Sequence, residues 1–523
     1  MKFPAGNFAG KDSEVVVMAE AVIVAGARTP IGKLSGALGG FSAMELGGFA
    51  IAEALIRAGI TADQVDYVLM GQVLQAGAGQ IPARQAAFKG GIPLTVPANT
   101  INKVCLSGLH TIYLADQMIR AGDADIVVAG GMESMTQAPY LLPGARAGYR
   151  IGDGALVDSM MYDGLTDAFD HIAMGLSTER YNEKAKISRE RQDAFAAASH
   201  EKAAAAAKDG RLAEEIVPVQ VPQRKGDPLL VDVDEGVRPG TTAESLAALR
   251  PAFDKNGTIT AGNASQISDG GAAVIVMSAA KAEELGLTPL GQIVSYGQVA
   301  GPDTSLLTQP SRAILQAAKK RDIEVRDIDL FEINEAFAAV GLASADDLGI
   351  DEEKINVNGG AIALGHPGGA HRAARAAPTR GQPGRRGAVR RWRAGRRRHP
   401  ALARLVLLEG RGEEVDQRGT LPLDVGPLRN LQAVDPQGAG RETAAGDVVA
   451  PFVVQVEQSQ GQCLRRRVVP DDHDRGHAVV ERAQAAQHVL GFGPVEIGRV
   501  QTSGLGGHTR QHQIGRGHGA GRR

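Results

Sequence analysis

Short apolar runs alternate with amphipathic, alanine-rich segments through the first 130 residues. The apolar runs occupy residues 21–25, 67–71 and 125–130, and helical periodicity fills residues 43–58 and 109–121 between them. Apolar runs separated by helices are typical of buried parallel strands joined by crossover helices. The pattern predicts an α/β unit in which functional side chains gather where strand ends meet helix starts.

The pattern changes between residues 131 and 260. This region holds a Met- and Gly-rich stretch, a helical segment at residues 188–208, and a polar, Pro-containing segment at residues 217–240. We interpret it as an insertion or lid within the α/β unit.

The α/β pattern then resumes and starts a second time. An apolar run at residues 272–277 is followed by another at 292–294 and by helical periodicity at 312–320. A second α/β unit therefore begins near residue 285.

Periodicity ends at His371, where Arg, Gly and Pro dominate. Apolar patches return at residues 402–408 and 448–456, but no turn signals organise them, and low-complexity sequence of this kind is typical of disorder. We therefore expect an incomplete second unit followed by a disordered tail. The predicted domains are an extension at 1–17, an N-terminal domain at 18–285 with its insertion at about 131–260, a truncated C-terminal domain at 286–370, and a tail at 371–523.

Composition narrows the protein class. The chain has 523 residues, of which 43% are hydrophobic and 22% charged, and only two are cysteines, too few for a disulfide framework. No apolar run reaches the roughly 20 residues of a membrane span, and the N-terminus lacks the pattern of a signal peptide. We expect a cytoplasmic protein with no membrane partner.

The net charge of −2 hides a division between the tail and the rest. Residues 1–370 carry 31 Lys and Arg against 45 Asp and Glu, whereas residues 371–523 carry 26 Arg, no Lys and 14 acidic residues. Arginine runs can bind nucleic-acid phosphates. The tail contains one Trp and no Tyr, however, so it lacks aromatic residues for base stacking, and we expect no nucleic-acid partner.

Cys105 is the first candidate for chemistry, because it stands just before a helical run. The positive end of a helix stabilises a thiolate, which makes such a sulfur a candidate nucleophile. The alternative is that Cys105 is a small buried apolar residue. A glycine-rich loop later in the chain carries His366, and imidazole is suited to accept a thiol proton near neutral pH. The alternative for His366 is a structural role.

Several segments together carry a family resemblance. They are Cys-Leu-Ser-Gly at 105–108, Val-Ala-Gly-Gly-Met-Glu-Ser-Met at 128–135, Gly-Asn-Ala-Ser-Gln at 262–266, Asp-Gly-Gly-Ala at 269–272, Asn-Glu-Ala-Phe-Ala at 334–338 and Gly-His-Pro at 365–367. In this order the chain resembles the thiolase family of acetyl-CoA C-acyltransferases over about residues 20–370. The resemblance implies two related βαβαβ halves in a layered αβαβα fold, with an inserted loop domain.

The resemblance also implies catalytic roles. Cys105 would accept the acyl group as a thioester, His366 would activate it, and Asn334, through a water, would stabilise an oxyanion together with His366. The alternative for Asn334 and Glu335 is that they cap the helix that follows. For Glu335 we favour support of the site over direct catalysis.

Coenzyme A is the carrier that the resemblance implies, as a substrate, with no permanently bound cofactor and no metal. Ser265 would contact the pantetheine arm, and Arg238 and Ser245 would lie at the adenine end, although Arg238 also fits an exposed surface charge. Leu165 and Met174 would line the acyl pocket. Ala173 departs from short-chain relatives, which often place His before that Met. Relatives are usually dimers or tetramers, so we expect a homo-oligomer.

The resemblance breaks at His371, after the Gly-His-Pro motif and Gly369-Ala370. Relatives carry a second active-site cysteine in a Cys-Gly motif near the C-terminus, whereas Cys463 lies beside three arginines and does not match it. Relatives continue with Gly-Ala-Ser-Gly-Ala, encoded for example by GGC GCA TCG GGC GCG. Read one base later, these codons give Ala-His-Arg-Ala, the sequence at residues 370–373. The hypothesis is a frame change near this point, so that residues 371–523 are out of frame.

The predicted function is acyl transfer between CoA thioesters, by 3-oxoacyl-CoA thiolysis or by condensation of two acetyl-CoA. Loss of the second cysteine is expected to impair it. The alternative is a catalytically inactive thiolase-fold protein that binds CoA or lipid, and CoA binding without thiolysis would identify it.

Overall fold

The computed structural model describes residues 19–367 and the backbone of Ala403–Gly410 and Pro451–Val454. All of these lie within one compact unit of the chain. The predicted extension at 1–17, Cys463 and the rest of the predicted tail lie outside the described residues.

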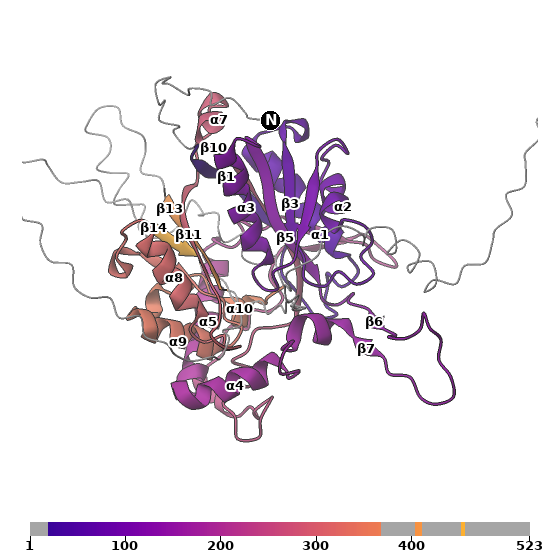
Figure 1. The fold of residues 1–523 in the computed structure, drawn as a ribbon, viewed down its shortest axis with the longest axis vertical. Coiled ribbons are helices and arrows are strands. Elements are labelled where there is room, and N and C mark those ends of the chain that lie inside the picture. The colour runs from indigo at the N-terminus through magenta and orange to yellow at the C-terminus, as the bar shows by residue number, and fades with distance from the viewer. Residues whose placement is uncertain (1–18, 368–402, 411–450, 455–523) are drawn as a thin grey trace, which may run out of the picture. The chain divides into compact units, whose positions relative to one another are not determined.

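Ten strands form one mixed sheet (Figure 1). From one edge to the other, nine of them are β12 (Leu330–Glu332), β14 (Pro451–Val454), β13 (Ala403–Gly410), β11 (Gly291–Val299), β1 (Ala21–Arg28), β10 (Ser268–Ser278), β5 (Ile126–Ser134), β3 (Tyr67–Gly71) and β4 (Ala98–Ile101). The tenth, β2 (Gly32–Lys33), pairs with the first residues of β10. The prediction of parallel strands is correct for β3 and β5 and wrong at the centre, where β1 and β10 run antiparallel to their neighbours. A fully apolar run does not reveal strand direction, which is why the sequence missed this.

The first half of the sheet is covered by helices on both faces. Alternate residues of a strand point to opposite faces. Thus Ile275 of β10 packs with α1 (Ala43–Ala58) and α2 (Pro82–Lys89), whereas Val274 packs with α3 (Ser107–Ala121). Burial on both faces explains the continuous apolar runs in the sequence.

The second half contains β11 to β14 with α8 (Gln309–Lys319) and α9 (Ala338–Leu348) (Figure 1). In the sheet it pairs with the first half at β1 and β11, where Val22 lies opposite Gln292 and Ile23 opposite Gly291. Two apolar runs of the predicted tail, which we expected to be isolated patches, are β13 and β14, parallel to β11 and β12. Pairing with β13 and β14 satisfies the backbone N–H and C=O groups along the edges of β11 and β12. Because the backbone makes these bonds, any apolar run of suitable length can form them.

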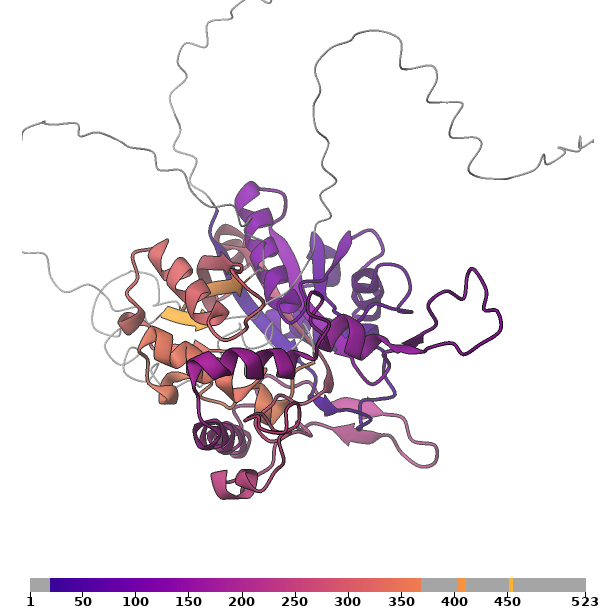
Figure 2. The same cartoon turned by 60° about the horizontal axis from the view of Figure 1, so that its bottom comes forward.

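The predicted insertion at about 131–260 begins within the end of β5, which extends to Ser134. It contains α4 (Met174–Ala185), α5 (Arg189–Lys208), α6 (Ala243–Ala247) and the hairpins β6 (Tyr140–Leu141) with β7 (Val157–Asp158) and β8 (Val219–Val221) with β9 (Leu229–Val231). The predicted helix at 188–208 is confirmed. Its first turn is capped by Ser188, whose Oγ accepts the Arg191 N–H at 3.3 Å. The segment between β6 and β7 projects outward in both views (Figure 1, Figure 2).

The remaining helical elements are short. They are α7 (Ala279–Glu284), α10 (Ala361–Leu364), the 3₁₀ turns Ala62–Gln64, Val325–Asp327 and Glu352–Lys354, and a π-helical turn at Met160–Leu165. No helix among the described residues combines the length and apolar character that crossing a membrane requires.

Candidate active site

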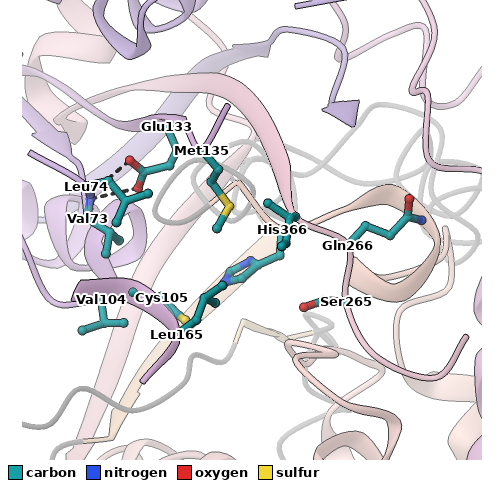
Figure 3. Close-up of a pocket in the computed structure, with 12 residues that line it drawn as sticks. Val73, Leu74, Val104, Cys105, Glu133, Met135, Leu165, Ser265, Gln266 and His366 are labelled. Carbon is teal, nitrogen blue, oxygen red and sulfur yellow. Dashed lines mark hydrogen bonds between the residues drawn. The ribbon is translucent and has the colours of Figure 1, made fainter. Parts of the chain in front are cut away.

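A cavity of about 60 Å³ lies beside the ends of β3 and β5 and the start of α3 (Figure 3). Its lining residues are Val73, Leu74, Val104, Cys105, Glu133, Met135, Gly164, Leu165, Ser265, Gln266, Ile267 and His366. The volume is several times the roughly 10–15 Å³ that a single water molecule needs. It therefore accommodates a small group beside Cys105 rather than a whole coenzyme.

Four of the predicted site residues meet at this cavity. Cys105, Leu165 and Ser265 come from the first domain as predicted, and His366 comes from the second. In Figure 3 the imidazole of His366 points toward the side of the cavity that holds Cys105 and Leu165. Residues far apart in the sequence thus bring a thiol and an imidazole to one cavity.

Cys105 sits in a tight loop before α3. The Ser107 hydroxyl accepts the Lys103 N–H at 2.9 Å and donates to the Val104 carbonyl at 2.6 Å. The Asn102 side chain accepts the Val104 N–H at 3.0 Å. These short-range bonds hold the backbone around the thiol, which is partly buried.

Two backbone features bring this loop close to the sheet. Val104 has a φ of +47°, a region that β-branched residues rarely enter and that often marks functional loops. At Gly71, the last residue of β3, an added Cβ would lie 2.5 Å from Gly108 N. Glycine therefore allows the start of α3, and Cys105 with it, to lie directly on the end of the strand.

His366 follows the one-turn helix α10 and is 8% exposed. Its backbone N–H donates to the Gln266 carbonyl at 3.1 Å. The preceding Gly365 has a φ of +101°, and a Cβ there would lie 2.2 Å from the Ser268 hydroxyl. Glycine at this position therefore allows the backbone before His366 to lie directly against Ser268.

Glu133 is a cavity residue whose separate role the sequence analysis missed. Its buried carboxylate accepts the Val73 N–H at 2.9 Å and the Leu74 N–H at 3.1 Å (Figure 3). It thereby fixes the loop after β3 that forms one wall. An acidic residue inside an otherwise apolar run was the available signal, because such a group is buried only with partners.

Asn334 is buried but does not line this cavity. The helix that follows starts at Ala338 and has Phe337 at its N-cap position, so the interpretation of Asn334 and Glu335 as its cap is wrong. Glu335 instead accepts bonds from the Ser199 hydroxyl at 2.7 Å and the Asn356 side chain at 2.8 Å. It links segments rather than ending a helix.

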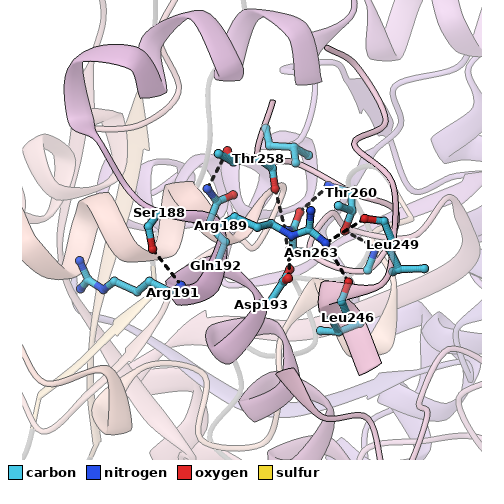
Figure 4. Close-up of polar contacts among 12 residues, drawn as sticks. Ser188, Arg189, Arg191, Gln192, Asp193, Leu246, Leu249, Thr258, Thr260 and Asn263 are labelled. Atoms are coloured by element: carbon cyan, nitrogen blue, oxygen red, sulfur yellow. Dashed lines mark hydrogen bonds and ion pairs between the residues drawn. The ribbon is translucent and has the colours of Figure 1, made fainter. Parts of the chain in front are cut away.

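Side chains of the insertion hold the segment that leads to Ser265 in place (Figure 4). Asn263 donates to the Asp193 carboxylate of α5 at 2.9 Å and accepts the Thr260 N–H at 2.8 Å. Arg189, on the same helix, pairs with Asp193 at 2.6 Å and donates to the Leu246 carbonyl at 2.8 Å. This network fixes the path of the chain into Ser265, whose N–H donates to Ala336 O at 2.9 Å.

The other predicted substrate contacts lie away from the cavity. Met174 is the first residue of α4 and packs against the hydrophobic cluster of the second half. Arg238 is exposed, and Ser245 is exposed on α6, where its hydroxyl donates to the Thr242 carbonyl at 2.7 Å. The structure does not bring these three residues to the thiol.

His200 on α5 lies next to the segment that carries Arg238 and is 3% exposed. Its Nδ1 accepts the Arg238 N–H at 3.2 Å. Burial, followed by the positive charge of Arg238, lowers the pKa of His200 from 6.5 to about 4. His200 is therefore neutral at pH 7.

Metal-ligand clusters are not found in the described part of the chain: no three His, Cys, Asp or Glu side chains there are grouped to hold an ion. The cavity itself brings together the thiol of Cys105, the imidazole of His366 and the carboxylate of Glu133.

Comparison with known proteins decides the family. Residues 21–280 match the thiolase N-terminal domain and residues 287–379 match the thiolase C-terminal domain. The chain belongs to the thiolase family. The predictions of the thiolase family and of its α/β fold are thereby confirmed. The family matches end at residue 379, within the predicted tail.

Individual thiolase relatives agree over the same portion. The chain is 61% identical over 346 residues to a probable acetyl-CoA acetyltransferase of Mycolicibacterium smegmatis, covering 66% of this chain and 89% of the relative. It is 54% identical over 354 residues to an acetyl-CoA acetyltransferase of Pseudomonas aeruginosa, covering 68% and 90%. The crystal structure of the Bacillus anthracis acetyl-CoA acetyltransferase matches with a TM-score of 0.66 and 42% identity, covering 68% of this chain and 90% of that one.

Proposed function

We propose that this thiolase transfers acyl groups between CoA thioesters through a thioester on Cys105. The observation that carries the proposal is the shared cavity, which both Cys105 of one domain and His366 of the other line. The names of the relatives, acetyl-CoA acetyltransferases, support the same reaction class.

The proton and acyl transfers of the first half-reaction use these two side chains. His366 takes the Cys105 proton, the thiolate attacks the thioester carbonyl of an acyl-CoA, and the C–S bond to CoA breaks. The departing CoA thiolate receives the proton from His366. In the reverse direction, a CoA thiol attacks the acyl-Cys105 thioester and carries the acyl group away. CoA is thus a substrate and carrier.

The remaining predicted residues have supporting roles in this proposal. Asn334, through a water, would stabilise the oxyanion together with His366, and Ser265 would contact the pantetheine arm. Leu165 would border the acyl group. Arg238 and Ser245 lie on the surface segment before and within α6, where an extended CoA could pass.

The carbon–carbon step needs a further acid and base. Condensation removes a proton from the α-carbon of an acyl-CoA, and thiolysis returns one to it. Relatives use the second cysteine for this, and the chain has no matching motif. We propose that the 523-residue chain forms the acyl-enzyme but is impaired in thiolysis and condensation.

Two assays separate these steps. Labelled CoA should exchange into acetyl-CoA, and mass spectrometry should find an acetyl group on Cys105, while acetoacetyl-CoA thiolysis stays near background. Thiolysis at the rate of a complete thiolase would contradict the impairment. CoA binding with neither exchange nor acetylation would contradict acyl transfer and favour the inactive binding protein.

The frame hypothesis is tested on the gene. Reading the alternative frames beyond codon 370 should recover Gly-Ala-Ser-Gly-Ala and then a Cys-Gly motif. A chain rebuilt in that frame should regain thiolysis. If neither alternative frame encodes these motifs, the hypothesis fails.

The domain boundaries and assembly are also proposals. We propose an N-terminal domain at 18–285 with the CoA-binding insertion at about 131–260, and a truncated C-terminal domain at 286–370. We further propose a homo-oligomer that acts in the cytoplasm. Light scattering of the purified chain tests the assembly.

A further inference from the structure

We propose that Glu335 and Gln266 are positioning residues that hold α10 at its two ends and thereby place His366 at the cavity. The inference rests on the proposed function, in which His366 activates Cys105. A helix of four residues is too short to be stable alone, so its position must come from other segments. The structure supplies such contacts from both sides.

Glu335 holds the first turn. The Ile362 N–H donates to its carboxylate at 3.0 Å, and the Gly360 N–H donates to the Ser199 hydroxyl at 3.0 Å. The Ser199 hydroxyl itself donates to Glu335. A Cβ on Gly360 would lie 2.1 Å from the Glu335 carboxyl carbon, so glycine is required for this approach. The carboxylate is 1% exposed and acts as an acceptor for three different segments.

Gln266 holds the other end. Its side-chain amide donates to the Ile362 carbonyl at 2.8 Å and to the Ala363 carbonyl at 3.1 Å, and its own carbonyl accepts the His366 N–H at 3.1 Å. These bonds satisfy acceptors at the end of α10 that a short helix leaves open. The same amide reaches the Gly236 carbonyl at 3.0 Å.

Each of these residues stands next to a predicted site residue. Glu335 follows Asn334, and Gln266 follows Ser265. Contacts with α10 thus fix Asn334, which would stabilise the oxyanion, and Ser265, which would contact the pantetheine arm, relative to His366. This explains why a histidine at the end of such a short helix keeps a defined place.

The test measures how readily Cys105 is alkylated, because this step needs no turnover. Iodoacetamide labelling is followed by mass spectrometry of the tryptic peptide 104–120, which separates Cys105 from Cys463. The titratable groups near the thiol are His366 and Glu133 at the cavity, and Lys103 and His110 beside the loop. Rates are measured from pH 5 to 10.

Glu335→Ala and Gln266→Ala should each slow labelling at neutral pH about tenfold and move the midpoint of the pH profile upward, toward that of His366→Ala, because a displaced imidazole no longer takes the proton. Glu335→Gln keeps an oxygen for the Ile362 N–H and should restore part of the rate. It also serves if Glu335→Ala fails to fold.

Controls separate the outcomes. Ile314→Val weakens the core of the same half and Glu183→Ala removes an exposed carboxylate; both should keep the wild-type profile. If folded Glu335→Ala and Gln266→Ala keep it too, the positioning inference is overturned. If His366→Ala keeps it, the proposed role of His366 is overturned instead.

Discussion

The loop of Cys105 and the loop of His366 meet at one cavity but are held in opposite ways. Most bonds around Cys105 join residues two to four positions apart, as in Ser107 with Lys103 and Asn102 with Val104, and the Asn102 amide also donates to the Val73 carbonyl 29 positions away. Bonds around α10 span 27 positions to Glu335, 96 to Gln266 and, from Ser199, 161. The nucleophile is placed mainly by its own neighbourhood, and the base by the completed fold. Changes that disturb one loop should therefore leave the other largely intact.

The largest effect is expected from Cys105→Ser. A serine hydroxyl is a far weaker nucleophile without strong activation, so CoA exchange should fall by at least about a thousandfold. Thermal unfolding should change little, because the substitution is nearly isosteric. Measurable exchange at the wild-type rate would remove Cys105 from the mechanism.

Gly71→Ala breaks the contact on which the Cys105 loop rests. Its Cβ would meet the backbone of Ser107 and Gly108 at 2.5 Å, and such overpacking costs about 1–3 kcal/mol or more. Urea unfolding should show the loss, and Cys105 labelling should slow. Gly297→Ala is the matched control, because its Cβ would meet Ala313 of α8 at 2.1 Å. It should destabilise the protein without changing the pH midpoint of labelling.

Ser107→Ala sharpens the comparison within the local loop. It removes the oxygen that accepts the Lys103 N–H, which costs about 1–2 kcal/mol and loosens the turn before α3. Cys105 labelling should change several-fold. Thr111→Val removes a buried hydroxyl one turn later, bonded to the carbonyls of Gly108 and Gly130, and should leave labelling unchanged. Equal effects of both would show that general stability, and not the turn, controls the thiol.

The smallest expected effect is a loss of stability in acid, which arises at His200 beside the long-range contacts of Ser199. His200 neighbours Ser199, and its pKa is lowered to about 4 in the folded protein. The unfolded chain therefore binds more protons between pH 6.5 and 4, so the free energy of unfolding falls as the pH falls through this window. After solvent screening we expect a loss of about 1 kcal/mol. Urea unfolding at pH 7 and pH 5 should show less acid loss in His200→Gln, and an equal loss would exclude His200 as the cause.

Sequence patterns located many elements closely. The predicted helix at 43–58 and strand at 67–71 agree with α1 and β3, because both have strong apolar periodicity. The edge strand β4 was missed, since Ala98–Ile101 lacks an apolar run and is only partly buried. Strands β13 and β14 were taken for isolated patches because their partners are distant in the sequence.

The sequence by itself determined the family and the two α/β units. It also identified Cys105 as a candidate nucleophile and His366 as a candidate base. These follow from local residue types and periodicity. Only the tertiary structure decided that they share a cavity and that Glu133 builds one of its walls. It also decided that Glu335 contacts α10 and does not cap the helix after it, and that Gln266 contacts α10 as well as lining the cavity. Such contacts join residues separated by up to 161 positions, and no local pattern in the chain records which distant groups will meet.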